Sequence, residues 1–313
     1  MNTICELLSI EKPILQGGMA NIATGAFAAA VSNAGGLGII ATGGRNADQI
    51  RVEIETCRSL TDKPFGVNLM LMNPHSDALA QLVAEMHVPV VTTGAGNPAK
   101  YVAKLKEAGV KVIPVVPSVG LARRMEGLGV DMIIAEGTES GGHVGELTTM
   151  ALVPQIVNAV KIPVIAAGGI ASGRQLVAAL ALGAQGVQVG TCLLVSEECP
   201  IHINYKQAIL DAKDIDTVVT GRSVGAPVRC LRNEMTKTYI EMEKNGTTTL
   251  ELEKLTLGSM RRAVLDGDVK TGSVMAGQVA GMIKEIRPLR VILDELMDEA
   301  KQTLSEMSTW RLP

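Results

Sequence analysis

A single histidine lies in a glycine-rich loop that also carries two carboxylates. The segment from Glu136 to Gly145 reads EGTESGGHVG, with His143 near its end. An imidazole donates or accepts a proton near neutral pH, so we expect His143 to be catalytic or to orient a substrate. The alternative is a structural histidine, which is our interpretation of the other three. No second His or Cys stands at metal-ligand spacing and no GxSxG motif occurs, which disfavours a metal site and acyl-enzyme chemistry.

Two further turns could bind a phosphate group. Gly168 and Gly169 follow a strand-like segment and precede a helix capped by Ser172, and Gly190 and Thr191 follow the next such segment. Backbone N–H groups in such turns, together with a helix N-terminus, bind phosphate oxygens. We therefore expect a phosphate at these two turns, although two ordinary tight turns would have the same sequence.

An amide side chain stands at another strand end. Asn68 offers donors and an acceptor, which is the mixture that the pyrimidine edge of a flavin requires. An asparagine that caps a loop would look the same. Gln16 and Gln188 are similar but weaker candidates.

Short apolar segments alternate with amphipathic ones along the first 190 residues, and their spacing predicts βα units. The expected strands are Pro13–Gln16, Leu37–Ala41, Phe65–Leu69, Pro89–Thr93, Lys111–Val116, Met132–Ala135, Val164–Ala167 and Val187–Gly190. The clearest expected helices are Asn21–Asn33, Asn46–Leu60, Pro98–Ala108, Ser172–Leu182 and Pro288–Leu304.

Eight parallel strands could form a closed barrel or an open doubly wound sheet. The count of eight, and the lack of an early GxGxxG followed by an acid, favour the barrel. The fold class that we predict is α/β, a TIM (β/α)8 barrel with a small helical insert domain after the eighth strand. All the candidate residues then lie at strand ends on one rim, where barrel enzymes carry their active sites.

The character of the sequence changes after the eighth strand. Met235–Lys244 and Leu250–Leu265 look helical, and an apolar, glycine-rich run follows at Gly272–Met282. We therefore expect two domains. Residues 1–200 with 272–313 would form the cofactor-binding barrel, and residues 201–271 would form a small helical domain for substrate or nucleotide.

Composition excludes several classes of protein. Hydrophobic residues make up 47% of the 313 residues and charged residues 19%, which excludes a disordered chain. A net charge of −3 and 2% aromatic residues argue against a nucleic-acid partner. No apolar stretch is long enough to span a membrane and no signal peptide is evident, so we expect a cytoplasmic protein. The five cysteines are widely spaced, which predicts buried, reduced thiols.

Several motifs resemble those of the flavin-dependent enoyl-acyl-carrier-protein reductases (type II), within the nitronate monooxygenase group. They are PILQGGMANIAT, FGVNLML, AEGTESGGHVG, AAGGIASG, GVQVGT and GSVMAGQ. The resemblance extends from Leu7 to about Leu304. It implies an FMN-containing barrel that uses NADH or NADPH to reduce a trans-2-enoyl group on acyl carrier protein in fatty-acid elongation.

The resemblance also implies roles for particular residues. His143 matches the family's active-site histidine. The expected cofactor contacts are Gly18, Met19, Asn68, Glu136, Gly142, Gly168, Gly169, Gly190, Thr191, Met275, Gly277 and Gln278. Within this set Gly18, Met19 and Asn68 would contact the isoalloxazine, and the last three would close over the cofactor. Family members can bind a monovalent or calcium-like cation near the histidine loop, and we further expect a homodimer.

Three other functions compete with the reductase. A nitronate monooxygenase would share the barrel, the FMN and His143, with the histidine as a base and O2 as the oxidant. A non-flavin isomerase or lyase would bind a phosphorylated sugar at the same glycine turns. A non-catalytic scaffold is disfavoured, because a phosphate rim beside a histidine is a catalytic arrangement.

Overall fold

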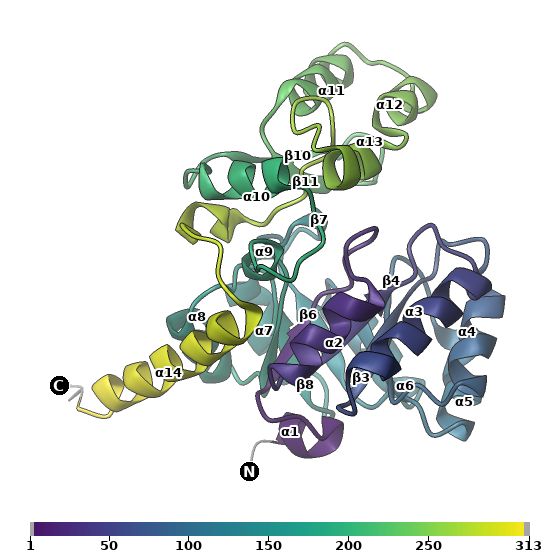
Figure 1. The fold of residues 1–313 in the computed structure, drawn as a ribbon, viewed down its shortest axis with the longest axis vertical. Coiled ribbons are helices and arrows are strands. Elements are labelled where there is room, and N and C mark those ends of the chain that lie inside the picture. The colour runs from purple at the N-terminus through teal and green to yellow at the C-terminus, as the bar shows by residue number, and fades with distance from the viewer. Residues whose placement is uncertain (1–2, 310–313) are drawn as a thin grey trace.

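The computed structural model describes residues 3–309, which contain a closed TIM-type (β/α)8 barrel (Figure 1). Its parallel strands pair in the order β1-β9-β8-β6-β5-β4-β3-β2, and Leu15 pairs with Leu37 to close the ring. The strands are β1 (Ile14–Gln16), β2 (Gly38–Ala41), β3 (Phe65–Met70), β4 (Val90–Gly94), β5 (Lys111–Val116), β6 (Ile133–Glu136), β8 (Val164–Ala167) and β9 (Gly186–Val189). All eight predicted strands are confirmed, each to within one residue at either end.

Helices surround the barrel, and side-chain caps fix where several of them begin. Asn46 forms a reciprocal capping box with Gln49, and the hydroxyls of Thr24 and Ser172 accept hydrogen bonds from the backbone of the first turn. The barrel helices are α1 (Thr3–Leu8), α2 (Gly25–Asn33), α3 (Ala47–Leu60), α4 (Ser76–Glu85), α5 (Ala99–Glu107), α6 (Val119–Gly127), α7 (Thr149–Val157), α8 (Gly173–Ala181), α9 (Thr191–Leu194) and α14 (Leu289–Met307). All five helices expected for this part of the chain are present with shifted ends.

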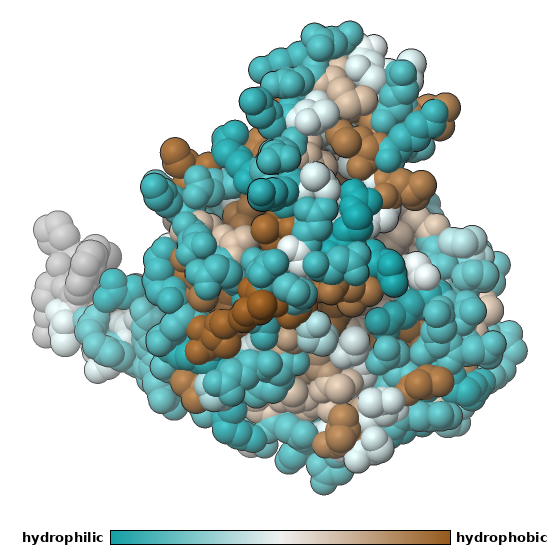
Figure 2. Space-filling model, turned by 45° about the horizontal axis from the view of Figure 1, so that its top comes forward, coloured by the Kyte–Doolittle hydropathy of each residue, from teal (hydrophilic) through white to brown (hydrophobic). Residues whose placement is uncertain are grey.

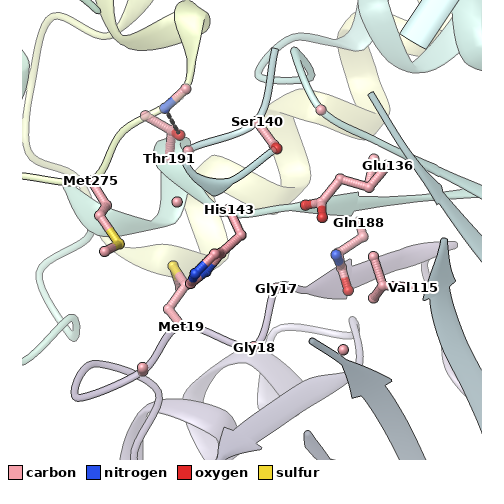
Figure 3. A pocket seen from close by; sticks show the side chains of 18 of the residues that line it. Gly17, Gly18, Met19, Val115, Glu136, Ser140, His143, Gln188, Thr191 and Met275 are labelled. Carbon is pink, nitrogen blue, oxygen red and sulfur yellow. Dashed lines mark hydrogen bonds between the residues drawn. The ribbon is translucent and has the colours of Figure 1, made fainter. Parts of the chain in front are cut away.

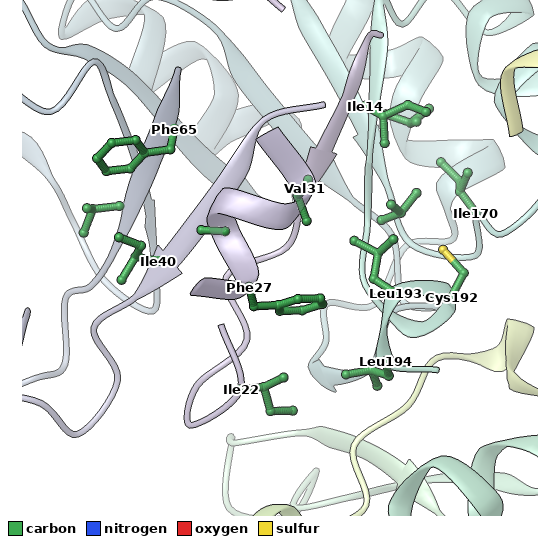
Figure 4. Packing of buried hydrophobic residues seen from close by; sticks show 14 of the residues in the cluster. Ile14, Ile22, Phe27, Val31, Ile40, Phe65, Ile170, Cys192, Leu193 and Leu194 are labelled. Carbon is green, nitrogen blue, oxygen red and sulfur yellow. The ribbon is translucent and has the colours of Figure 1, made fainter. Parts of the chain in front are cut away.

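The core has two layers, because successive residues of each strand point to opposite faces. Leu15 and Ile39 belong to the cluster inside the barrel, and Ile4 and Leu8 of α1 belong to the same cluster. Ile14 and Ile40 belong to the outer cluster between strands and helices. Figure 4 shows part of this outer layer, where Phe27 of α2 reaches toward Leu193 and Leu194 of α9.

The insert stands over one end of the barrel (Figure 1) and is not purely helical. Its helices are α10 (Ile203–Leu210), α11 (Glu234–Lys244), α12 (Thr249–Thr256) and α13 (Ser259–Arg261). The strands β10 (Thr217–Thr220) and β11 (Val228–Leu231) form an antiparallel sheet with β7 (Gly142–His143), which belongs to the barrel's histidine loop. The prediction of helices alone missed this sheet. The division at residues 201 and 271 stays a prediction.

The expected helix Leu250–Leu265 is also interrupted. It breaks after α12 because Gly258 takes a positive φ of 69°, and the chain then continues through α13 into a single wide turn at Arg262–Asp266. A short 3-10 helix, Gln278–Met282, lies in the apolar run that leads back to the barrel.

The hydropathy of the helices and surface, and the burial of the cysteines, can be compared with what the sequence predicts. Within residues 3–309 no helix is long and apolar enough to cross a membrane. Figure 2 shows hydrophilic side chains over most of one face, with hydrophobic side chains in separate patches. No cysteine forms a disulfide in the described part of the chain, and burial raises the pKa of four of them to about 12, so these stay protonated near neutral pH. The four are Cys57, Cys192, Cys199 and Cys230.

Candidate active site

A cavity of about 610 Å³ opens at the carboxyl ends of the barrel strands, beneath the insert. It brings together His143 and eleven of the twelve predicted cofactor residues. Those eleven are Gly18, Met19, Asn68, Glu136, Gly142, Gly168, Gly169, Gly190, Thr191, Met275 and Gly277. Gln278 does not line the cavity. Its side chain is exposed, and its backbone N–H instead donates to the Glu139 carbonyl at 2.9 Å.

The two glycine turns line one wall of the cavity and form a cradle without side chains at Gly168, Gly169 and Gly190. Gly168 and Gly169 have φ values of 94° and 72°, which strongly favour glycine. A Cβ on Gly168 would lie 2.7 Å from the Gly137 carbonyl oxygen. Among residues 3–309, no lysine or arginine lines the cavity, so a phosphate there would depend on backbone N–H groups and on hydroxyls such as that of Thr191.

His143 lies on a short strand that pairs with the insert. The expectation of an irregular loop is therefore wrong at this residue, because Val228 of β11 is its backbone partner. Figure 3 shows the imidazole pointing into the cavity toward Met19. The ring keeps access to solvent, yet partial burial lowers the pKa of His143 below its ordinary value. The imidazole is therefore mostly neutral at pH 7, with one nitrogen as donor and the other as acceptor.

A polar corner lies on the opposite side of the cavity, where Figure 3 shows Glu136 beside Gln188. Burial has the largest effect on Glu136 and raises its pKa to about 7, while the Ser140 hydroxyl acts in the other direction. Asn68 donates its amide hydrogen to the Thr92 hydroxyl at 2.9 Å, which leaves amide capacity for a ligand. Gln188, a weaker candidate from the sequence, lines the cavity, but Gln16 is buried away from it.

Glu139 is a lining residue that we did not predict. Both of its carboxylate oxygens accept from the Thr149 backbone N–H at 2.9 Å, and one also accepts from the Thr149 hydroxyl at 3.0 Å. Glu139 thus caps α7 at its positive N-terminal end. Its place in the histidine loop was the available signal, but its partner lies ten residues away across the cradle.

Four methionines line the cavity: Met19, Met70, Met260 and Met275. Met70 and Met260 were not predicted, since an isolated methionine is more often a core residue. Two hydrogen bonds hold the segment that carries Met275. The Tyr205 hydroxyl donates to the Met275 carbonyl at 2.8 Å, and the Gly277 N–H donates to the Thr191 hydroxyl at 2.9 Å. Flexible thioethers suit an unbranched apolar ligand.

Comparison with known proteins identifies the family. The family model described as nitronate monooxygenase matches residues 2–81 and 74–299. The chain belongs to the nitronate monooxygenase family. It is 34% identical to a probable nitronate monooxygenase of Staphylococcus saprophyticus, across 96% of this chain and 97% of that protein. It is 32% identical to the (3aS,4S,5R,7aS)-5-hydroxy-7a-methyl-1-oxo-octahydro-1H-indene-4-carboxyl-CoA dehydrogenase of Mycobacterium tuberculosis, across 95% of each.

Among solved structures, FabK from Thermotoga maritima matches with a TM-score of 0.96 and 50% identity, over 98% of each chain. The predicted resemblance is therefore confirmed, because the family model matches and FabK is a structural neighbour of high identity. Members of the nitronate monooxygenase family are FMN-dependent flavoenzymes, and this chain is an oxidoreductase of that family.

Proposed function

We propose that the protein is an FMN-dependent enoyl-acyl-carrier-protein reductase that uses NADH or NADPH. The observation that carries the proposal is the 50% identity to FabK over 98% of each chain, with a TM-score of 0.96. FabK is an enoyl-acyl-carrier-protein reductase. The Mycobacterium relative is named for a carboxyl-CoA substrate, and a CoA ester is a thioester like the substrate proposed for this chain.

The cavity fits FMN on two grounds. The left-handed Gly168–Gly169 turn leaves a cradle without side chains, and Gly190 and Thr191 lie beside it, so these residues would hold the phosphate. The remaining predicted contacts would surround the ring and ribityl chain, and they are Gly18, Met19, Asn68, Glu136, Gly142, Met275 and Gly277. When bound, FMN supplies hydride transfer between a reduced nicotinamide and an unsaturated acyl group.

The chain's own groups supply binding and proton transfer. Saturating the double bond of an enoyl thioester requires a proton at the α-carbon. His143 is mostly neutral near pH 7 and lies in the cavity, so its N–H can supply that proton or bind the thioester oxygen. Met70, Met260 and Met275 would contact the acyl chain. Acyl carrier protein as the carrier, a homodimer, a monovalent cation and a cytoplasmic location stay predictions.

A nitronate monooxygenase is the second candidate, because the Staphylococcus relative carries that name. Purified protein is assayed anaerobically with NAD(P)H and an enoyl thioester, and aerobically with an alkyl nitronate without reduced nicotinamide. We expect enoyl reduction to be the faster reaction. Faster nitronate turnover would replace the proposal. Family membership favours a flavin over the isomerase or lyase alternative, and a colourless protein that does not bind FMN would contradict both flavin functions.

Replacing the histidine tests its role. His143→Ala should keep FMN, because backbone groups of the glycine turns hold the phosphate, but enoyl reduction should fall roughly 100-fold or more. Reaction with NAD(P)H should fall less, since only enoyl reduction needs the α-carbon proton. Stopped-flow absorbance separates the two reactions. Equal slowing of both would make His143 a residue that shapes the pocket.

A further inference from the structure

Arg229 is a buried cation without an ion-pair partner. It lies on β11 with 6% of its surface exposed, and no ion pair of an arginine within residues 3–309 includes it. Buried arginines are rare unless a carboxylate neutralises them. Burial, and then Arg222, lower the pKa of Arg229, while Glu139 acts in the opposite direction. Guanidinium nevertheless stays protonated in proteins, so the charge is held without direct neutralisation.

Two of the three hydrogen bonds of its side chain connect the insert to the histidine loop, and the third lies within the insert. Nε and Nη2 donate to the Thr138 carbonyl oxygen at 3.2 and 3.0 Å. Nη1 donates to the Thr217 hydroxyl on β10 at 3.0 Å. The backbone of Arg229 pairs with Gly142, next to His143. The side chain of Arg229 therefore holds the loop at Thr138, five residues before His143. Its backbone holds the loop at Gly142, one residue before His143.

Arg229 contacts the histidine loop at two positions, Thr138 and Gly142. Between Thr138 and Gly142 the loop carries Glu139, which caps α7 beside the phosphate cradle. The insert thus contacts the loop at two points that are separated in sequence but share one residue of β11. A planar guanidinium can donate to two acceptors in fixed directions, which an ammonium cannot reproduce.

We propose that Arg229 is a positioning residue for His143, and that through it the insert sets where the imidazole lies in the cavity. The proposal rests on the function proposed above, in which His143 contacts the substrate. Arg229 does not line the cavity, so it acts through the loop and not on the substrate.

The first test does not depend on activity. The imidazole of His143 is titrated by NMR in the FMN-bound protein, with its signal assigned by its loss in His143→Ala. Arg229→Lys keeps the charge but loses the two-acceptor geometry, so the loop should loosen and the pKa of His143 should rise toward its ordinary 6.5. The acids that share the cavity, Glu136 and Glu139, are unchanged in this variant. An unchanged titration would overturn the proposal.

Arg232→Lys is the matched control. Arg232 lies just beyond β11 and is exposed, and its side chain donates to the Ile215 carbonyl at 3.2 Å, within the insert. Its replacement should leave the His143 titration and the activity unchanged. An equal shift in both variants would indicate general loosening of the insert and would overturn the proposal. If Arg229→Lys does not fold, Thr217→Val removes only the hydroxyl that Nη1 binds and should shift the titration in the same direction.

A double-mutant cycle gives the second test. Arg229→Lys should slow enoyl reduction about 10- to 100-fold, the scale for displacing a reacting group by about 1 Å. In the His143→Ala background it should cost less than about threefold, because the group that it positions is gone. Equal costs in both backgrounds would overturn the proposal. If His143→Ala is itself without effect, the proposed function is at fault, and the NMR titration still decides the role of Arg229.

Discussion

At the scale of single residues, backbone conformation and charge decide what this cavity accepts. Glycine at a strand end is visible in sequence, so it could be predicted that Gly168 and Gly169 line the cavity, while the binding of a phosphate there stays a prediction. The roles of Glu139 and Arg229 could not be predicted, because each depends on a hydrogen-bond partner that the sequence does not indicate. Glu139 binds Thr149, and Arg229 binds the backbone carbonyl of Thr138. Residues that act through their own backbone are therefore easier to predict than residues that act through a distant contact.

Gly169→Asp should weaken FMN binding, and Gly169→Asn separates the causes. Both variants place a side chain at a φ of 72°, where a Cβ lies 3.1 Å from the Glu139 Cβ. Only Asp adds negative charge beside a phosphate, at a cost on the order of 1–4 kcal/mol beyond the Asn variant. FMN titration of the apoproteins measures the difference. Equal affinities in two folded variants would place the phosphate elsewhere.

Glu136→Gln should change how stability depends on pH. The folded pKa of Glu136 is about 7 against an ordinary 4.5, so its contribution is complete below pH 4.5 and is lost as pH rises through 7. Relative to the wild type, the Gln variant should gain up to about 3 kcal/mol between pH 5 and pH 8. Urea unfolding of the apoproteins at several pH values measures this, with the exposed Glu107→Gln as control. Parallel curves for wild type and Glu136→Gln would contradict the raised pKa.

At the scale of elements, the insert helps to form the candidate site, since it lines the cavity through Met260 and pairs with the strand that carries His143. Strand β7 has two residues, Gly142 and His143, and exists because β11 of the insert pairs with it. A two-residue strand has no periodicity to detect, so the sequence predicts only a loop at His143. The hairpin of β10 and β11 was not predicted for a related reason. Its strands have four residues each and lie among polar segments, so their alternation of apolar and polar residues is too short to indicate strands.

Tyr205→Phe tests how the insert holds the segment over the cavity. The Tyr205 side chain is fully buried and its hydroxyl donates to the Met275 carbonyl, so its loss leaves that carbonyl unpaired. We expect a loss of about 1–3 kcal/mol in the free energy of unfolding. The KM for the enoyl substrate should rise more than kcat falls, because Met275 lies in the wall of the cavity and not at the proton donor.

Tyr239→Phe is the control for this experiment. Tyr239 is 7% exposed, and its hydroxyl makes no hydrogen bond with the described part of the chain. Its replacement should change stability by less than about 0.5 kcal/mol. A similar loss in the two variants would mean that the Tyr205 hydroxyl has no specific role.

At the scale of the whole molecule, the barrel was predictable because its pattern repeats. Each strand is short, apolar and followed by an amphipathic helix, so eight weak signals agree with one another. Helix α1 has no such repeat, so its sequence did not predict it. Ile4 and Leu8 of this helix pack into the inner core at the amino ends of the strands, away from the cavity.

This separation of the two barrel ends predicts that stability and cofactor binding can be changed independently. Leu8→Ala removes a side chain that is 3% exposed and should lower the free energy of unfolding by about 2–5 kcal/mol. Leu7→Ala, at a neighbouring side chain that is 38% exposed, should cost less than about 1 kcal/mol. FMN affinity should stay within about twofold of the wild type in both variants, because the glycine turns lie at the other end of the barrel.

Urea unfolding and FMN titration of the same preparations measure the two properties. A folded Leu8→Ala protein with weakened FMN binding would show that the packing of α1 is transmitted through the inner core to the phosphate cradle.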